Sequence, residues 1–128
     1  MVYLDANVLI RFILKDNKEM AAKAADAITT GEAFVLEGVF AEVVYVLTKV
    51  YNTDRAVVTD YLLHLLPFVK TDNAVVLKSA LHYYAETKLD FVECLLAAYH
   101  LVEKKEILTF DKKLNNFMKR AEKEMQDA

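Results

Sequence analysis

The sequence predicts an α/β fold: a three-layer α/β/α arrangement in which a short parallel sheet is flanked by helices. Short apolar runs alternate with longer segments whose apolar residues recur at helical spacing, which is the pattern of strands joined by helical crossovers. Two glycines and one proline among 128 residues leave few helix breakers and few irregular linkers. We expect one domain over residues 1–128, because this length is sufficient for a substantial core.

The first part of the chain predicts two strands and three helices. Residues 1–4 form an apolar run that predicts a short buried strand, and helical spacing begins in residues 7–15. A narrow, alanine-rich apolar face predicts a second helix at 17–28. A second short strand is expected at 33–36, and a stripe of valines then predicts a long helix at 37–51.

Turn residues divide the middle of the chain. The turn at residues 52–54 ends in Asp54, a favourable N-cap, and predicts a helix at 55–66. Pro67 separates this helix from a predicted strand at 68–70.

The last part of the chain predicts three helices and one strand. These are a helix capped by Asp72 or Asn73 that runs to about Thr87, a helix at 91–104 that starts at Asp90, a strand at 106–109, and a helix at 112–123. The tail, from about residue 120 to 128, is expected to fray.

Composition narrows the class of protein. Hydrophobic residues make up 55% and charged residues 27%, the profile of a soluble globular protein. No uncharged apolar run approaches the roughly 18 residues that span a bilayer, and Asp5 falls where the apolar segment of a signal peptide would begin. The single cysteine, Cys94, excludes an internal disulfide and fits a reducing compartment, so we expect a cytoplasmic protein. The net charge of −3 argues against charge-driven binding of nucleic acid, although an acidic site that recruits cations escapes this argument.

Two aspartates follow predicted strands. Asp5 interrupts the apolar opening MVYLDANVLIRF, and Asp111 follows the strand predicted at 106–109. In open α/β sheets, ligands bind outside the carboxyl ends of the strands, so both side chains are expected at one edge. The alternative is that each aspartate simply N-caps the helix that follows it.

Glu42 is harder to explain as a surface residue. A helical projection places it beside Val39 and Val46, at the edge of an apolar stripe. Burial of an unpaired carboxylate costs several kcal/mol, so a salt bridge to Arg11 or to a lysine is the alternative to a functional role.

The stretch LDFVECLLAAYHLV is apolar almost all round and predicts a central, well-covered helix. Its exceptions, Asp90 and Glu93, lie three positions apart and share one surface of that helix. An N-cap for Asp90 and a favourable position near the helix N-terminus for Glu93 are the alternatives. His100 is interpreted as a packed helix residue.

Five acids therefore interrupt or end apolar elements: Asp5, Glu42, Asp90, Glu93 and Asp111. Carboxylates that lie close together raise one another's pKa, and when all are ionised they require compensating positive charge. Their oxygens are hard ligands, and no Cys/His cluster accompanies them. This donor set favours Mg²⁺ or Mn²⁺ over zinc.

Four short motifs resemble those of the PIN-domain family, in the same order and with similar spacing. They are LDANVLI at residues 4–10, FAEVV at 40–44, DFVECLLAA at 90–98 and LTFDKKL at 108–114. The resemblance extends from residue 2 to about residue 118, which is nearly the whole chain.

The resemblance implies a small endoribonuclease of the VapC toxin type that cleaves RNA with Mg²⁺ or Mn²⁺. Such ions lower the pKa of a bound water and stabilise charge on the departing oxygen of a phosphodiester. By position, the catalytic and metal-binding acids would be Asp5, Glu42, Glu93 and Asp111, with Asp90 as a further metal ligand and Asn7 and Thr109 as accessory polar residues.

One position departs from the family pattern. The family most often has Asp where this chain has Glu93, whose extra methylene moves the carboxylate by about one bond length. A catalytically weak or inactive PIN-fold interaction protein is therefore the alternative function. A metal-dependent phosphatase or DNA nuclease that uses the same acids is a further one.

Partners follow from the surface and from the resemblance. Candidate RNA phosphate contacts are Arg11, Lys15, Lys112, Lys113 and Lys119, although ordinary surface charge explains each equally well. The predicted helices at 37–51 and 55–66 carry more Val, Leu and Tyr than one narrow core face needs, which indicates either a thick core or an interface. The resemblance implies a homodimer and a cognate antitoxin protein.

Overall fold

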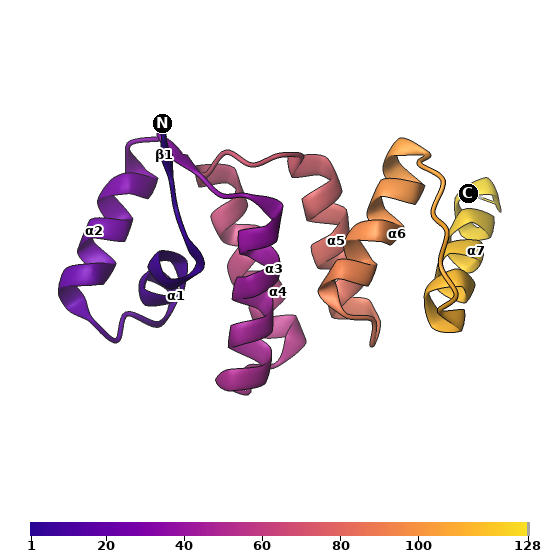
Figure 1. Ribbon diagram of the computed structural model, residues 1–128, viewed down its shortest axis with the longest axis horizontal. Coiled ribbons are helices and arrows are strands. Elements are labelled where there is room, and N and C mark those ends of the chain that lie inside the picture. Colours follow the sequence, from indigo (N-terminus) through magenta and orange to yellow (C-terminus); the bar gives the residue numbers. More distant parts are fainter. Residues whose placement is uncertain (128) are drawn as a thin grey trace. The chain divides into compact units, whose positions relative to one another are not determined.

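The computed structural model of the protein describes residues 1–127, and the chain divides into two compact units, Met1–Ala74 and the residues from Val75 onward (Figure 1). The elements of the N-terminal unit are β1 (Val2–Tyr3), α1 (Ala6–Leu14), α2 (Lys18–Thr29), β2 (Ala33–Phe34), α3 (Glu37–Tyr45), the π-helix η1 (Val46–Val50), α4 (Arg55–Leu65) and the 3₁₀ helix η2 (Leu66–Phe68). The elements of the C-terminal unit are α5 (Ala74–Glu86), α6 (Phe91–Glu103) and α7 (Lys112–Asp127).

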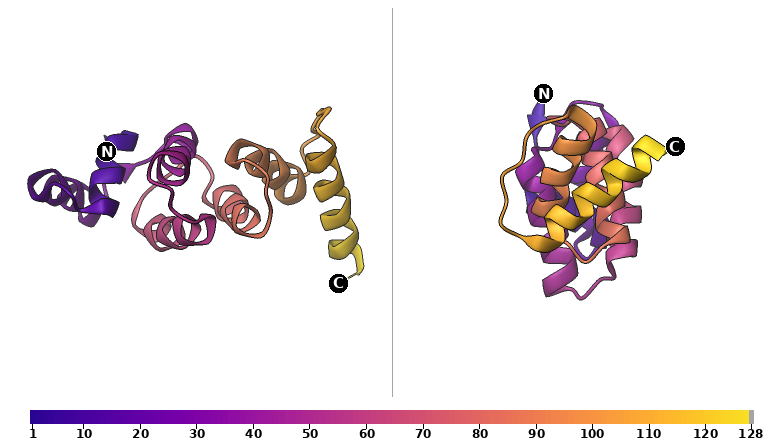
Figure 2. Two further views of the ribbon diagram at one scale, coloured as in Figure 1. Left: turned by 90° about the horizontal axis from the view of Figure 1, so that it is seen from below. Right: turned by 90° about the vertical axis from the view of Figure 1, so that its right-hand side faces the viewer.

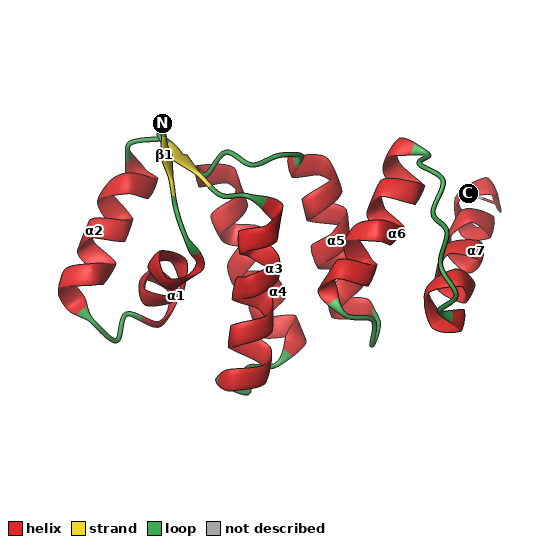
Figure 3. Cartoon of the chain, in the orientation of Figure 1, coloured by secondary structure: helices red, strands yellow, loops and turns green. Residues whose placement is uncertain are grey.

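A short parallel sheet organises the N-terminal unit (Figure 3). Strand β1 pairs with β2 in parallel, with Val2 opposite Ala33 and Tyr3 opposite Phe34. The rings of Tyr3 and Phe34 stack with their centroids 4.8 Å apart, and Phe34 also forms a parallel bridge to Lys70. Helices α1 and α2 connect the two strands. The structure therefore confirms the predicted α/β class, with a short parallel sheet flanked by helices.

The strand predictions hold only in part. The structure confirms a first strand, but the prediction that it is buried is wrong, because Val2 is 50% exposed and the core residue is Leu4, just after the strand. The region predicted as a strand at 68–70 contributes only the bridge at Lys70, since Pro67 lies in the first turn of η2. The second error arises because an apolar run of three residues carries no periodicity that distinguishes a strand from a turn.

The last predicted strand, at 106–109, is wrong. Residues 104–111 form a connecting segment without regular structure, and Leu108 is 87% exposed. Lys104, at the end of α6, adopts a left-handed conformation with a φ of 57°. It turns the chain into this segment. No strand within the described C-terminal unit offers backbone partners for it.

The predicted helices are confirmed, with changes at their ends. The long helix expected at 37–51 consists of α3 and the wider π turn of η1. Asp54 precedes α4 without a capping hydrogen bond from its side chain, whereas Oδ2 of Asp72 accepts a hydrogen bond of 2.7 Å from the N–H of Glu37 at the start of α3. Helix α7 continues to Asp127, beyond the predicted end, so the described part of the tail expected to fray is helical; Ala128 lies outside the described residues.

Each unit has its own set of buried apolar side chains. In the N-terminal unit they include Leu9, Phe40, Val43, Leu47, Val58 and Leu62. In the C-terminal unit they include Leu77, Leu81, Cys94, Ala97 and Leu114. Helices α6 and α7 lie side by side (Figure 2). Among the described residues, no helix combines the length and the apolar character needed to cross a bilayer.

Two adjacent valines of α4 test this packing. Val58 is fully buried and Val57 is 43% exposed. Val58→Ala removes two buried methyl groups and leaves a cavity, so we expect the free energy of unfolding to fall by about 2 kcal/mol. Val57→Ala is the matched control and should change it by less than about 0.5 kcal/mol. Urea unfolding of both variants gives the comparison, and equal losses would contradict the assignment of the core.

Candidate functional site

Asp5 links the first strand to the first helix. It follows β1 and N-caps α1: the N–H of Val8 donates to Oδ1 of Asp5 at 3.0 Å. The side chain is exposed, and Asn7, also exposed, lies in the first turn of the same helix. The cap uses Oδ1 of Asp5. Its Oδ2 has no hydrogen bond or ion pair among residues 1–127.

Glu42 lies on α3 at the edge of the apolar stripe, where Val39 and Val46 are half-buried, but its own side chain is exposed, so the cost of burying a carboxylate does not arise. Its neighbours Val43 and Val44 occupy the buried positions of that turn. The salt bridge considered for Glu42 is absent from the described residues, because the guanidinium of Arg11 has other partners. Glu42 therefore remains an unpaired, solvent-facing carboxylate in the described part of the chain.

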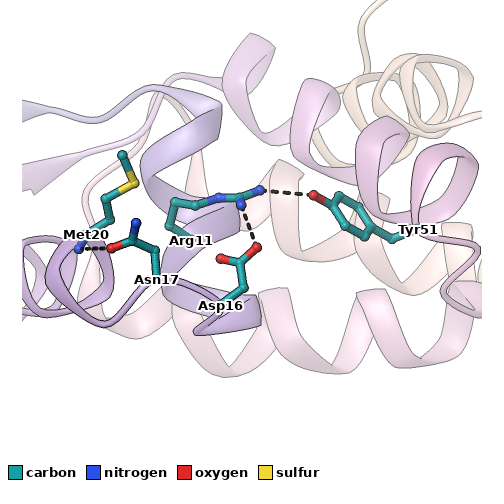
Figure 4. A network of polar contacts seen from close by, with 5 residues as sticks. All are labelled: Arg11, Asp16, Asn17, Met20 and Tyr51. Atoms are coloured by element: carbon teal, nitrogen blue, oxygen red, sulfur yellow. Dashed lines mark hydrogen bonds and ion pairs between the residues drawn. The ribbon is translucent and has the colours of Figure 1, made fainter.

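Arg11 belongs to a network at the end of α1 (Figure 4). Its Nη1 pairs with Oδ2 of Asp16 at 2.5 Å, and its Nη2 donates to the hydroxyl of Tyr51 at 3.1 Å. The hydrogen bond to Tyr51 and the charge of Asp16 raise the pKa of Arg11. This guanidinium joins α1 to the residue that follows η1, so its donors are partly committed within the protein. Asp16, five residues downstream at the helix end, was the sequence signal for this pairing, which the sequence interpretation missed.

Asp90 and Glu93 form a capping box at the start of α6. The N–H of Glu93 donates to Oδ1 of Asp90 at 2.8 Å, and the N–H of Asp90 donates to Oε1 of Glu93 at 3.3 Å. The alternatives that treat both residues as helix-start residues are therefore realised in the structure. The capping box also holds the two carboxylates next to each other at the exposed start of a helix.

Asp111 occupies the equivalent place on α7. The N–H of Leu114 donates to Oδ1 of Asp111 at 2.8 Å. Thr109 fixes this residue from behind, because its Oγ1 accepts from the N–H of Asp111 at 3.1 Å and its carbonyl accepts from Nδ2 of Asn115 at 2.9 Å. Asp111 thus has a defined orientation although no strand precedes it, and its Oδ2 has no partner among residues 1–127.

The acids of the C-terminal unit influence the pKa of Glu93. Partial burial raises the pKa of Glu93, and the hydrogen-bonding and negative charge of Asp90 raise it further, as does the charge of Asp111. Carboxylates affect one another in this way only at short range. The capping box joins Asp90 and Glu93 directly, and Asp111 lies in the same unit, whereas Asp5, Asn7 and Glu42 belong to the N-terminal unit.

The five candidate acids offer oxygen ligands of the kind that a divalent cation binds. All five acids supply hard carboxylate oxygens, which suit Mg²⁺ and Mn²⁺. Asp5 and Asp111 each keep one carboxylate oxygen free of other partners in the described structure, so the chemistry of the residues fits such an ion. Over residues 1–127, no three His, Cys, Asp or Glu side chains within either unit are already grouped as a metal site.

The remaining candidate contacts lie on the surface. Lys112, in the first turn of α7 next to Asp111, is exposed and forms no ion pair in the described part of the chain. Lys15, Lys113 and Lys119 are exposed as well. Lys112 therefore keeps its ammonium available to a ligand, in contrast to Arg11.

His100 ties the segment that carries Asp111 to two helices, which the sequence interpretation described only as packing. Its Nδ1 contacts the carbonyl oxygen of Lys105 at 2.7 Å, and its Nε2 forms an ion pair with Oε1 of Glu122 on α7. With Glu122 ionised, both partners are acceptors, and an imidazolium that carries hydrogen on both ring nitrogens satisfies them. The hydrogen bond to Glu122, and next that to Lys105, raise the pKa of His100 above its ordinary value.

The fold is that of a small α/β protein, and its candidate carboxylates lie at the starts of helices α1, α6 and α7 and, for Glu42, within α3. The family model of the PIN domain matches residues 2–120, and the chain belongs to the PIN domain family. PIN domains are generally nucleases, they act on RNA or DNA, and they typically use divalent metals. No curated protein and no solved structure matches the chain.

The ion pair of His100 predicts a pH dependence of stability. A histidine whose pKa is raised by folding stabilises the native state fully below its unfolded pKa of about 6.5, and this contribution is lost as the pH rises through the folded pKa. We expect the difference in free energy of unfolding between wild type and Glu122→Gln to be largest near pH 6 and to shrink toward pH 8. Urea unfolding at both pH values measures it, with Glu124→Gln on the same helix as the control. A difference that is constant with pH would contradict the imidazolium assignment.

Proposed function

We propose that the protein is an endoribonuclease that cleaves phosphodiester bonds of RNA with Mg²⁺ or Mn²⁺, and that it is the VapC-type toxin of a toxin–antitoxin pair in the cytoplasm. The observation that carries this proposal is the PIN domain match over residues 2–120, because PIN domains are generally nucleases. RNA rather than DNA, and the toxin role, rest on the motif resemblance of the four short segments to VapC-type proteins.

The proposed catalytic acids are Asp5, Glu42, Glu93 and Asp111, with Asp90 as an additional metal ligand. A bound divalent ion would lower the pKa of a water and stabilise charge on the departing oxygen. The chain's own contribution is to hold the carboxylates in place. Asp5 and Asp111 are held through one oxygen by helix N–H groups and present the other, and Thr109 restrains Asp111. Asn7, two residues after the Asp5 cap and in the same unit, is a proposed accessory residue.

Surface residues support the proposed partners. The helices predicted at 37–51 and 55–66 carry more apolar residues than one core face needs. Among these residues, the side chains of Tyr45, Tyr51 and Tyr61 are 63%, 43% and 50% exposed. Leu62 and Leu65, in contrast, belong to the core. The interface interpretation therefore applies to the tyrosines and the thick-core interpretation to the leucines. Exposed tyrosines suit a protein interface, because their rings are apolar and their hydroxyls form hydrogen bonds. We propose a homodimer through this surface, and an antitoxin protein as a second partner.

The capping geometry gives a sharp test of the catalytic role. Asn caps helices as well as Asp does, since its Oδ1 accepts the same hydrogen bond without a negative charge. Asp5→Asn and Asp111→Asn should therefore unfold within about 0.5 kcal/mol of wild type. Cleavage of a labelled single-stranded RNA with Mg²⁺ or Mn²⁺ should fall at least about 100-fold, because metal ligands matter at least as much as the groups that orient them.

Controls separate this result from trivial causes. Asp26→Asn changes an exposed acid on α2 and should leave cleavage unchanged. EDTA should abolish cleavage by the wild type. Cleavage that persists in EDTA, or that survives Asp5→Asn, would refute the metal-dependent mechanism. A panel that includes DNA and a phosphomonoester distinguishes the other nucleases and phosphatases that the same acids allow.

A catalytically inactive PIN-fold interaction protein is the second candidate. One observation favours it. Oε1 of Glu93 accepts a hydrogen bond from the N–H of Asp90, and Glu93 stands at the position where the family most often has Asp. Calorimetric titration with Mn²⁺ discriminates the two functions. An inert protein should show no binding that Asp111→Asn removes.

A further inference from the structure

A basic pocket in the C-terminal unit is not used by the proposed catalytic acids. It has a volume of about 400 Å³, within the range of roughly 300–1,000 Å³ that is typical of ligand sites. Its lining includes Lys88 on the turn after α5 and Lys113, Asn116 and Arg120 on α7. All of these residues lie in one unit, so the pocket is a feature of that unit alone.

The charge of this pocket is opposite to that of the whole chain. Three cations, Lys88, Lys113 and Arg120, and one carboxylate, Glu86, line it, which gives three positive and one negative charge and a local balance of +2. None of the three cations forms an ion pair among the described residues. The whole chain has a net charge of −3, so the average composition of the chain does not account for a local positive charge at this pocket.

The guanidinium of Arg120 lies over an aromatic ring. Cζ of Arg120 lies 5.8 Å from the ring centroid of Phe117, a cation–π distance, and Phe117 packs edge-to-face on Tyr83 with centroids 5.1 Å apart. The guanidinium is therefore oriented by an anchored ring, and its N–H donors make no ion pair in the described structure. A planar fork of donors of this kind matches the oxygens of a phosphate.

The opposite wall of the pocket is also fixed. Thr87 Oγ1 donates to the carbonyl of Tyr83 at 2.8 Å and accepts from the N–H of Leu89 at 3.2 Å. This closes the turn that presents Lys88. On α7, Lys113 and Arg120 lie seven positions apart and share one face of the helix with Asn116.

Two lysines of the pocket lie close to the acids along the chain. Lys88 precedes Asp90 by two residues, and Lys113 follows Asp111 by two residues. With about 3.8 Å between consecutive Cα atoms, each of these lysines is within about 8 Å of its acid along the backbone. A strand of nucleic acid whose scissile phosphate lies at the acids would reach this pocket with its neighbouring nucleotide.

We propose that this pocket, formed by Lys88, Lys113, Asn116 and Arg120, binds the phosphate backbone of the RNA strand beside the cleaved bond. The inference rests on the proposed ribonuclease function for its choice of ligand. It assigns the binding of substrate, which the carboxylates repel, to a separate group of side chains. It also assigns Lys88 and Arg120 a role that the sequence pattern alone did not indicate.

The test measures binding and its salt dependence rather than cleavage. Fluorescence anisotropy of a fluorescein-labelled single-stranded RNA of about 12 nucleotides, in EDTA, gives the Kd between about 50 and 200 mM salt. For a single strand, each phosphate contact contributes about 0.7 to the slope of log K against log salt. The variant Lys88→Gln/Lys113→Gln/Arg120→Gln should therefore lower the slope by about 2, and should weaken binding at least about tenfold at the lower salt concentration.

A matched variant removes the same charge elsewhere. Lys18, Lys49 and Lys78 are exposed and lie outside the pocket, so Lys18→Gln/Lys49→Gln/Lys78→Gln should leave the slope within about 0.5 of wild type. Equal losses in the two triple variants, or wild-type binding by the pocket variant, would overturn the proposal. Should the pocket variant not fold, as judged by circular dichroism, Lys88→Gln alone changes a residue outside any helix and should lower the slope by about 0.7.

The outcomes separate the two proposals. A wild-type protein that binds RNA through the pocket but does not cut it supports the pocket and refutes the ribonuclease. A protein that cuts RNA while its binding is indifferent to the pocket variant supports the ribonuclease and refutes the pocket.

Discussion

Every α-helix begins with backbone N–H groups that have no partner inside the helix, and this chain meets that requirement with acidic side chains at three helix starts. Asp5, Asp90 and Asp111 each accept from an N–H of the first turn through Oδ1. Such a cap satisfies the helix and at the same time fixes a carboxylate at an exposed place, with a negative charge that the helix N-terminus stabilises. Capping and ligand presentation are therefore compatible uses of one side chain, and the structural alternative considered for each aspartate does not count against its functional role.

Helix positions were predictable from the sequence because they depend on local patterns. The spacing of apolar residues located the helices from α1 to α7, and Asp90 marked the start of α6 as an N-cap. The motif order also predicted the family, which the match over residues 2–120 shows. These successes share a cause: each rests on residues within a few positions of one another, whose side chains meet whenever the helix forms.

The failures of prediction share the opposite cause. The run at 106–109 is apolar enough for a strand, but a strand exists only where another strand offers its backbone, and four residues do not reveal that partner. Glu42 is exposed because the projection of one helix does not tell which of its edges is covered. Arg11 had a partner in Asp16 nearby, yet its second partner, Tyr51, lies 40 positions away and could not be found from spacing. Long-range contacts, rather than local propensity, decided all three cases.

Net charge was the least informative of the sequence properties for function. A value of −3 for the chain is an average over acids that gather at helix starts and cations that gather elsewhere. Interactions between exposed charges decay over about 8–10 Å at physiological salt, so a polyanionic strand responds to the side chains next to it and hardly to the total. An acidic centre that repels its substrate in isolation needs unpaired cations within that distance, and Lys88 and Lys113 lie two residues from Asp90 and Asp111. The separation of the two kinds of charge over such short stretches of chain is what the two proposals together require, a cation at the carboxylates and a phosphate backbone at the lysines.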